Sequence, residues 1–310
     1  MLNSRTRLAA QSWGVLVWII LVILWGALVR ATGSGAGCGQ HWPLCHGQMI
    51  PSLERYQTWI EYGHRASSGL SLIAVFWIGI RAFRAFRAGD SASRTIRRLA
   101  VFSMIGIVIE AAIGAALVLL RLVEHDQSVD RAISIALHLG NTCFLVGSLA
   151  LLSQALSGVE VSWPESAKLR KHGLWVLIGF VVLAAAGAWT ALGDTLFSVK
   201  NFQAGWVRDW AQDAHFLERL RILHPVLAAG WLVIAITWLQ SLTPTRMTRL
   251  ALGLILSNVA VGAFNVLLAA PLVLQILHLA VANSLWVSLI LCFGRGERRG
   301  EDAMRFGHQL

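Results

Sequence analysis

The side chains best suited to chemistry in this sequence are one glutamate and four histidines, all near the ends of long apolar runs. Glu61 and His64 are three residues apart, so they share one face if this stretch is helical. His138, His224 and His278 occur in the same setting further along the chain. Ionisable groups are costly in a membrane segment, and those that are retained there usually have a function. These five side chains are therefore the candidate site.

The imidazole side chains indicate what such a site would hold. Neutral imidazole nitrogen is a good ligand for iron, and two facing histidines in a four-helix bundle can occupy both axial positions of a haem. Pairing His64 with His138, and His224 with His278, predicts two haem sites. The competing interpretation is that each histidine only forms hydrogen bonds between helices. Zinc is disfavoured, because closed zinc sites usually add cysteine or carboxylate ligands at short spacing.

The composition predicts the scaffold that positions these residues. The chain has 310 residues, of which 56% are hydrophobic and 14% charged, and its mean hydropathy is +0.63. A soluble domain of this length could not cover so much apolar surface, and the apolar runs lack the alternation of barrel strands. We therefore expect an all-α, polytopic membrane protein. Eight segments have spanning length: 13–29, 60–80, 99–120, 132–152, 173–192, 220–240, 249–270 and 272–293.

The eight predicted helices divide into two pseudo-repeated four-helix bundles. Long outer connections follow the first and fifth helices, and the tripeptide Leu-His-Leu around His138 recurs around His278. Inverted or parallel repeats of this kind occur in many membrane proteins. The expected organisation is an N-terminal half at 1–157, a cytoplasmic linker at 158–172, a C-terminal half at 173–294 and a cytoplasmic tail at 295–310. All four histidines then lie near one depth on the outer side.

The basic residues predict the orientation in the membrane. With the N-terminus inside, 17 of the 26 lysines and arginines fall on inner segments, in agreement with the positive-inside rule. The sequence thus predicts a multi-pass protein of the plasma membrane, surrounded by lipid, with both termini in the cytoplasm. The formal net charge of +10 then reflects topology, and no nucleic-acid partner is expected.

A polar outer loop carries two of the four cysteines, Cys38 and Cys45. On the oxidising side of a membrane, this pair predicts either a disulfide that closes a small loop or a redox-active pair. A metal site that uses His41 or His46 is a weaker alternative. The other two cysteines lie in apolar runs and are expected to be core residues.

Other ionisable residues lie near the predicted helices. Glu110 should face the bundle interior, with Arg65 or Arg121 as its partner or with a place on a haem-linked proton path. Four arginines at the outer boundary are expected either to extend to the lipid headgroups or to pair with haem propionates: Arg30, Arg65, Arg219 and Arg221. Four histidines are expected to be solvated loop residues: His125, His172, His215 and His308.

Taken in order, these motifs resemble the heme A synthase family. The resemblance is carried by Arg30-Ala-Thr-Gly-Ser-Gly, Trp42-Pro-Leu-Cys45, Glu61-Tyr-Gly-His64-Arg65 and Leu137-His138-Leu139-Gly-Asn141, together with the later histidines. It covers nearly the whole chain in motif order, topology and spacing. The outer loop at 193–219 carries no cysteine pair, so the symmetry between the halves is expected to stop at the helices.

The resemblance implies an oxidoreductase that converts the C8 methyl group of heme O to a formyl group, making heme A for cytochrome oxidase. It implies that His64 and His138 serve the substrate haem, and that His224 and His278 hold a resident heme b. It also implies, as partners, the enzyme that produces heme O and an electron acceptor that the residues do not identify. A homo-oligomer is left open.

The same histidines would suit a two-haem electron-transfer protein, or a haem carrier, with no chemistry of its own. Glu61 favours the enzyme, because axial ligation needs only histidines and the matching position of the sixth helix is Arg221. We expect the Glu61 carboxylate to stabilise charge at the methyl carbon or to accept a proton from an attacking water. The competing expectation is a salt bridge with Arg65 or Arg55 that only fixes the loop.

Overall fold

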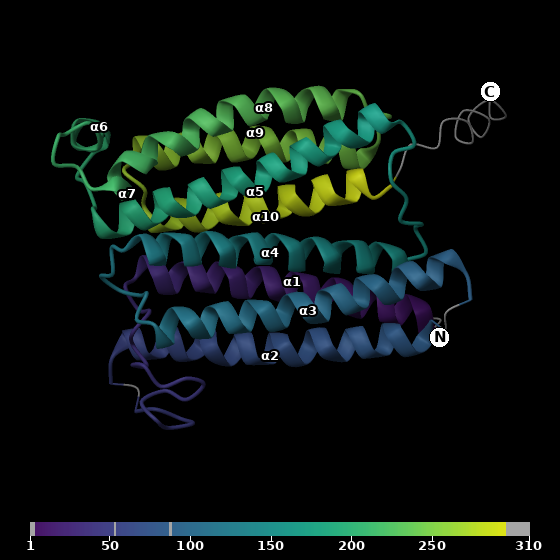
Figure 1. The fold of residues 1–310 in the computed structure, drawn as a ribbon, viewed down its shortest axis with the longest axis horizontal. Helices are drawn as coiled ribbons and strands as arrows, with labels where there is room; N and C mark the ends of the chain where they lie inside the picture. Colours follow the sequence, from purple (N-terminus) through teal and green to yellow (C-terminus); the bar gives the residue numbers. More distant parts are fainter. Residues whose placement is uncertain (1–3, 53, 87–88, 296–310) are drawn as a thin grey trace.

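The computed structural model describes residues 4–52, 54–86 and 89–295, and every regular element in these ranges is helical. Figure 1 shows the elements in order: α1 (Ser4–Ala31), α2 (Tyr56–Ala85), α3 (Ser91–Leu119), α4 (Val129–Leu156), α5 (Ala167–Leu196), α6 (Phe202–Asp209), α7 (Phe216–Arg219), the 3₁₀ turn η1 (Leu220–Ile222), α8 (Leu223–Gln240), α9 (Arg246–Leu267) and α10 (Leu272–Phe293). Polar N-cap side chains begin several of them, such as Ser128 before α4 and Ser166 before α5.

The described residues contain eight stretches long and apolar enough to cross a membrane, which confirms the predicted all-α, eight-span fold. One span combines α7, η1 and α8 as Phe216–Gln240. Several helices begin before the predicted apolar segments, because polar turns continue the helix beyond the apolar stretch, whereas α10 has the predicted bounds. Thus α1 begins at Ser4, and α5 begins at Ala167, inside the stretch expected to be linker. The short helix α6 was not predicted, and the tail beyond residue 295 lies outside the described residues.

Two of the histidines expected in solvated loops have structural contacts. His172 lies in α5, where its Nε2 is 3.1 Å from the carbonyl oxygen of Ile234. His215 is the N-cap of α7 and forms a capping box with Glu218. His125 is exposed outside the helices, as expected, and His308 lies outside the described residues.

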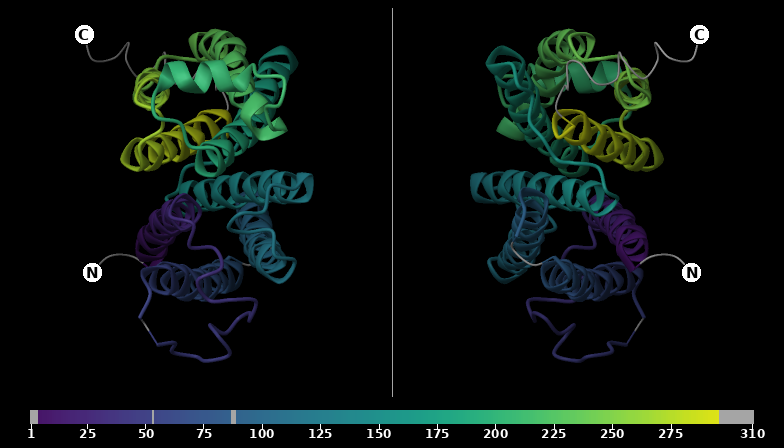
Figure 2. Two further views of the ribbon diagram at one scale, coloured as in Figure 1. Left: turned by 90° about the vertical axis from the view of Figure 1, so that its left-hand side faces the viewer. Right: turned by 90° about the vertical axis from the view of Figure 1, so that its right-hand side faces the viewer.

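The helices form two bundles that lie side by side (Figure 1). One contains α1–α4, and the other contains α5 and α8–α10. The end views in Figure 2 show α4 between the bundles, and α4 packs on α1 and α3 in its own half and on α5 and α10 across the boundary. The start of α1 and the end of α10 lie at the same end of the molecule (Figure 1). An even number of spans requires this arrangement.

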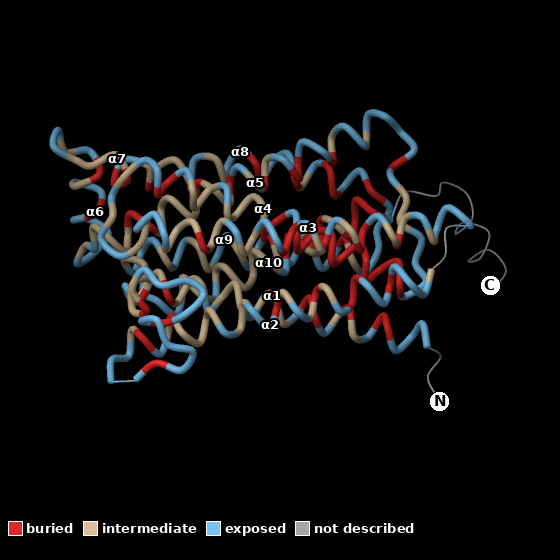
Figure 3. Tube along the Cα trace, turned by 60° about the horizontal axis from the view of Figure 1, so that its bottom comes forward, coloured by how far each residue is buried: buried red, intermediate tan, exposed pale blue. Residues whose placement is uncertain are grey.

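The packed core lies in the half of the bundle nearest the chain ends (Figure 3). Residues of α4 from Thr142 to Leu156 are buried except Phe144, whereas those from Ile133 to Asn141 are intermediate or exposed. The same division occurs in α10, where burial begins at Leu285. The parts of α4 and α10 that carry His138 and His278 are therefore less tightly enclosed by the chain than the opposite ends.

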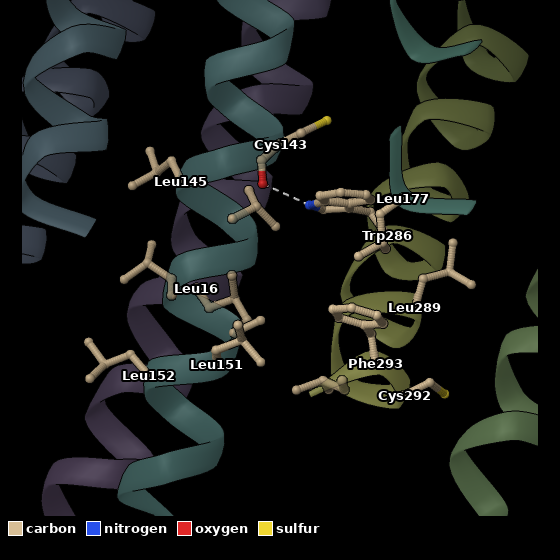
Figure 4. Packing of buried hydrophobic residues seen from close by; sticks show 14 of the residues in the cluster. Leu16, Cys143, Leu145, Leu151, Leu152, Leu177, Trp286, Leu289, Cys292 and Phe293 are labelled. Carbon is tan, nitrogen blue, oxygen red and sulfur yellow. Dashed lines mark hydrogen bonds between the residues drawn. The ribbon is translucent and has the colours of Figure 1, made fainter. Parts of the chain in front are cut away.

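The two bundles are joined in this core by apolar contacts and a hydrogen bond. Figure 4 shows Trp286 of α10 donating from Nε1 to the carbonyl oxygen of Cys143 in α4, at 2.8 Å. Both free cysteines are buried, as predicted. Within the N-terminal bundle, the hydroxyls of Ser12 and Ser153 are hydrogen-bonded at 2.7 Å. Lipid chains are as apolar as leucine, so such polar contacts and close packing hold membrane helices together.

Candidate functional site

Each of the four candidate histidines packs against a glycine of a neighbouring helix. The pairs are Gly26 with His64, Gly114 with His138, Gly187 with His224, and Gly262 with His278. A methyl group added at these glycines would lie 3.1, 3.9, 3.0 and 2.9 Å, in that order, from Cε1 of the histidine. These glycines were not predicted from the sequence, although one occurs in the odd-numbered span before each histidine. Their repetition relates the two halves helix by helix.

His224 of α8 and His278 of α10 lie side by side in the C-terminal half. Their ring centroids are 6.2 Å apart, and the ring planes are perpendicular. His224 Nδ1 lies 3.1 Å from the carbonyl oxygen of Leu183. A proton on Nδ1 would donate to this carbonyl and leave the Nε2 lone pair free for a ligand. His278 Nδ1 is buried and has no partner of good hydrogen-bond geometry among the described residues, although His278 interacts with the backbone of Asn258 in α9.

In the N-terminal half, His64 of α2 and His138 of α4 lie close enough for charges on the two rings to interact. Both Nδ1 atoms are buried, and neither has a hydrogen-bond partner among the residues that the structure describes. Behind His138, its Nδ1 lies 3.5 Å from Oε1 of Glu110 in α3. Glu110 faces the bundle interior, as predicted, but the predicted arginine partners were wrong. Its carboxylate instead accepts hydrogen bonds from Asn141 and Thr142 of α4.

The Glu61 side chain is buried and faces the outer loop. Its Oε2 accepts a hydrogen bond from the backbone N–H of Cys38 at 2.7 Å, and its Oε1 accepts one from Arg65 Nε at 3.0 Å. Arg65 also donates to backbone carbonyls of the loop, at Gly39, His41 and Leu44. Glu61 therefore connects the loop to the first turns of α2, next to His64. The expected Arg65 salt bridge is present, and the sequence did not reveal the contact with Cys38.

The loop contains a disulfide between Cys38 and Cys45, which confirms the predicted pairing. The loop lies so close to α2 that a methyl group at Gly37 would collide with the carbonyl oxygen of Gln57. Thr58 adds a hydrogen bond from its hydroxyl to the carbonyl of Gly37 at 2.8 Å. Among the described residues, no group of three or more histidine, cysteine or acidic side chains is arranged to hold a metal ion.

We predict that Cys38 and Cys45 resist thiol labelling in intact cells until a reductant is added. Replacing Cys45 with Ser should lower the free energy of unfolding of the loop by about 2–3 kcal/mol, because the disulfide reduces the conformational entropy of the unfolded loop. The measurement is mass-resolved thiol labelling with and without reductant, and protease cleavage of the loop in the variant. Labelling of both cysteines without reductant would contradict the prediction.

Three of the four outer arginines, Arg30, Arg65 and Arg221, have side-chain contacts within the protein, whereas Arg219 is exposed and donates to the carbonyl of Gln212 at 2.9 Å. Extension to headgroups and pairing with haem propionates both stay predictions.

Arg30 of α1 reaches the C-terminal half, where it donates to Gln275 of α10 at 2.9 Å and also contacts Thr195 of α5. Arg221 is buried and lies 3.4 Å from Asp194 and 3.4 Å from Asp209. Arg30 therefore joins the two halves, while Arg221 joins α5, η1 and α6.

The helix α6 is held by ion pairs outside the spans. Arg208 contacts Asp213 and Glu218, each at 2.8 Å. The hydrogen bond from Arg208 lowers the pKa of the Asp213 carboxyl, whereas burial raises the pKa of the Asp209 carboxyl against the attraction of Arg221. These contacts fix α6 beside the first turns of the span that carries His224.

Fold and site define a class of protein: a multi-pass membrane protein of two four-helix bundles, with two candidate histidines in each. Comparison with known families places it more narrowly. The family model described as cytochrome oxidase assembly protein matches residues 9–290, and the chain belongs to this COX15-CtaA family. Family membership agrees with the resemblance found in the sequence motifs.

Individual relatives carry two different names. Proteins named heme A synthase from Staphylococcus haemolyticus and Exiguobacterium sp. are each 30% identical to this chain, over 85% and 88% of it, and the match covers 87% of each relative. A protein named protoheme IX farnesyltransferase from Thermus thermophilus is 40% identical over 97% of the chain. The chain spans only half the length of that relative.

Proposed function

We propose that this protein is a heme A synthase, an oxidoreductase that converts the C8 methyl group of heme O to a formyl group. The observation that carries the proposal is a difference between two similar halves. Each half has a histidine pair with matching glycines, but a glutamate precedes His64 by one helical turn where Arg221 precedes His224. In a protein that only carried electrons between two haems, this carboxylate would serve only to dock the outer loop.

His224 and His278 would hold a resident heme b in the C-terminal half. Two imidazoles bound to one metal ion through bonds of ~2 Å have ring centroids roughly 6 Å apart, and the observed separation of His224 and His278 is 6.2 Å. The Leu183 carbonyl would orient His224, as outer-shell acceptors commonly do for metal-binding histidines. A heme b held here would accept and release single electrons.

In the N-terminal half, His64 and His138 would bind the substrate heme O. Oxidation of the methyl group with oxygen from water balances as methyl plus water giving formyl plus four protons and four electrons. The Glu61 carboxylate would take a proton from the attacking water or stabilise positive charge at the methyl carbon. The electrons would leave through the C-terminal half to an acceptor in the membrane.

The farnesyltransferase name of one relative does not favour farnesyl transfer by this chain. This chain aligns with only half of that longer protein, while it aligns with most of the length of the heme A synthases. We therefore assign farnesyl transfer to the part of the longer protein that this chain does not match. A heme O-producing enzyme is the expected partner, because the substrate of the proposed reaction is heme O.

We also propose that the protein lies in the plasma membrane, with the start of α1 and the end of α10 on the cytoplasmic side. Arg81, Arg84, Arg94, Arg97 and Arg98 all lie at the inner ends of α2 and α3 or in the connection between them, as the positive-inside rule requires. Both haem sites and the disulfide loop would then lie towards the outer side.

The test is to supply heme O to the purified protein in lipid and to extract the pigments. Heme A, or a hydroxylated intermediate, beside heme b is the expected result. Recovery of unchanged heme O beside heme b, with electron transfer between the two sites intact, would instead support the electron-transfer interpretation. A parallel reaction with heme b and a farnesyl donor should yield no heme O.

Replacing Gly262 with Ala should lower heme b binding about tenfold, the scale expected when the surroundings of a metal ligand are disturbed. The added methyl group would lie 2.9 Å from His278 Cε1, so the ring must move. Gly253→Ala is the matched control in α9, because no atom outside that helix lies within 4 Å of the added methyl. Haem titration of both variants measures the effect, and equal affinities would show that the glycine contact is not required.

A further inference from the structure

Glu110 is a carboxylate within a membrane span, and the described structure surrounds it with neutral donors. Asn141 Nδ2 donates to its Oε2 at 2.6 Å, and the Thr142 hydroxyl donates to Oε1. Asn141 also donates to the carbonyl of Gly106. His138, Asn141 and Thr142 are spaced i, i+3 and i+4, so one face of α4 presents both the histidine and the two donors to α3.

These contacts hold Oε1 of Glu110 next to Nδ1 of His138. The distance from Oε1 to His138 Nδ1 is 3.5 Å, and Nδ1 has no hydrogen-bond partner in the part of the chain that the structure describes. Gly114, one turn along α3 from Glu110, leaves room for the same imidazole ring. The Asn141 and Thr142 side chains therefore fix the carboxylate, and the carboxylate lies at the ring nitrogen opposite to Nε2.

The C-terminal half lacks this arrangement at the corresponding positions. Gly262 faces His278 as Gly114 faces His138, and the residue one turn earlier is Asn258 in place of Glu110. The Leu-His-Leu motifs align Asn141 and Thr142 with Val281 and Ala282, which cannot donate side-chain hydrogen bonds. The carboxylate and both donors thus occur together behind one histidine and are replaced together behind the other.

We propose that Glu110 is a positioning residue for His138, and the inference rests on the proposed function. When His138 binds iron through Nε2, its Nδ1–H donates to Glu110 Oε1, which fixes the tautomer and the ring orientation. A carboxylate acceptor also makes the imidazole a stronger electron donor than a neutral acceptor does. His138 would then be a more electron-rich ligand for the substrate haem than His224 or His278 would be for the heme b of the C-terminal half. Such a ligand would stabilise the ferric state and positive charge on the substrate.

The test uses the full-length purified protein in lipid, loaded with heme b as the probe for both sites. The N-terminal site is identified as the haem that His138→Ala removes. Glu110→Gln should raise the dissociation constant of that haem about tenfold and shift its midpoint potential upward, with the C-terminal haem unchanged. Glu110→Asp retains a charge but withdraws it by one methylene group, and it should show the same loss of affinity.

Ser12→Ala is the matched control, because it removes the hydrogen bond from α1 to Ser153 of α4 and leaves every contact of Glu110 in place. It should bind and titrate like the parent protein. A Glu110→Gln protein with parental affinity and potential would overturn the inference, as would a Ser12→Ala protein that reproduces the Glu110→Gln result. If His138→Ala retains both haems, His138 is not a ligand, and the N-terminal site of the proposed function fails instead.

Discussion

Replacing His224 and His278 together with Ala is expected to remove heme b from the purified protein while the eight spans remain inserted. Both proposed iron ligands are lost, and loss of affinity should exceed about 100-fold, because outer-shell changes alone cost 10–100-fold. The fold should persist because the packed core lies at the opposite end of the spans, around Trp286 and Leu289. A single replacement should leave one ligand and convert a six-coordinate, low-spin spectrum to a five-coordinate one.

The measurement is the visible spectrum and the extracted pigment of each variant, with thermal unfolding as the check on the fold. His172→Ala is the matched control, because this histidine of α5 contacts the carbonyl of Ile234 and lies near the inner end of its span. It should keep its full complement of haem. A heme b signal of normal size in the double variant would refute the assignment of these ligands.

Replacing Glu61 with Gln should lower the conversion of heme O to heme A by at least ~100-fold, the usual scale for losing a general base. The amide retains the size of the side chain and can still accept the hydrogen bond from the Cys38 N–H. It cannot carry the charge or take a proton from water. We expect haem binding to remain normal, and product formation to stop or to stall at a hydroxylated intermediate.

The main alternative is that Glu61 matters only because it docks the disulfide loop. Thr58→Val is the matched control, since it removes another bond between α2 and Gly37 of the loop and leaves the carboxylate in place. Equal losses of activity in both variants would assign the effect to the loop. Near-normal heme A production by Glu61→Gln would show that the charge is not catalytic, and would favour the electron-transfer interpretation. Pigment analysis of both variants, with protease sensitivity of the loop, separates these results.

The sequence alone determined the membrane class and the eight spans. A bilayer leaves few structures open to an apolar segment of about 20 residues, so length and hydropathy suffice. They do not locate helix ends, because polar turns continue the helix beyond the hydrocarbon layer. For this reason α1 begins at Ser4 and α5 at Ala167, outside the predicted apolar segments. The polar helix α6 gave no hydropathy signal at all.

Only the tertiary structure decided which side chains meet. Glu110 contacts Asn141, which is 31 residues away, and Arg30 contacts Gln275, which is 245 residues away. The contacts between the four glycines and the histidines were not predicted from the sequence either. In a soluble protein, the apolar stripe of a helix indicates the face that packs inward. In a membrane span, lipid and protein interior are both apolar, so the rotation of each helix, and with it every side-chain partner, is set by close packing and hydrogen bonds between helices.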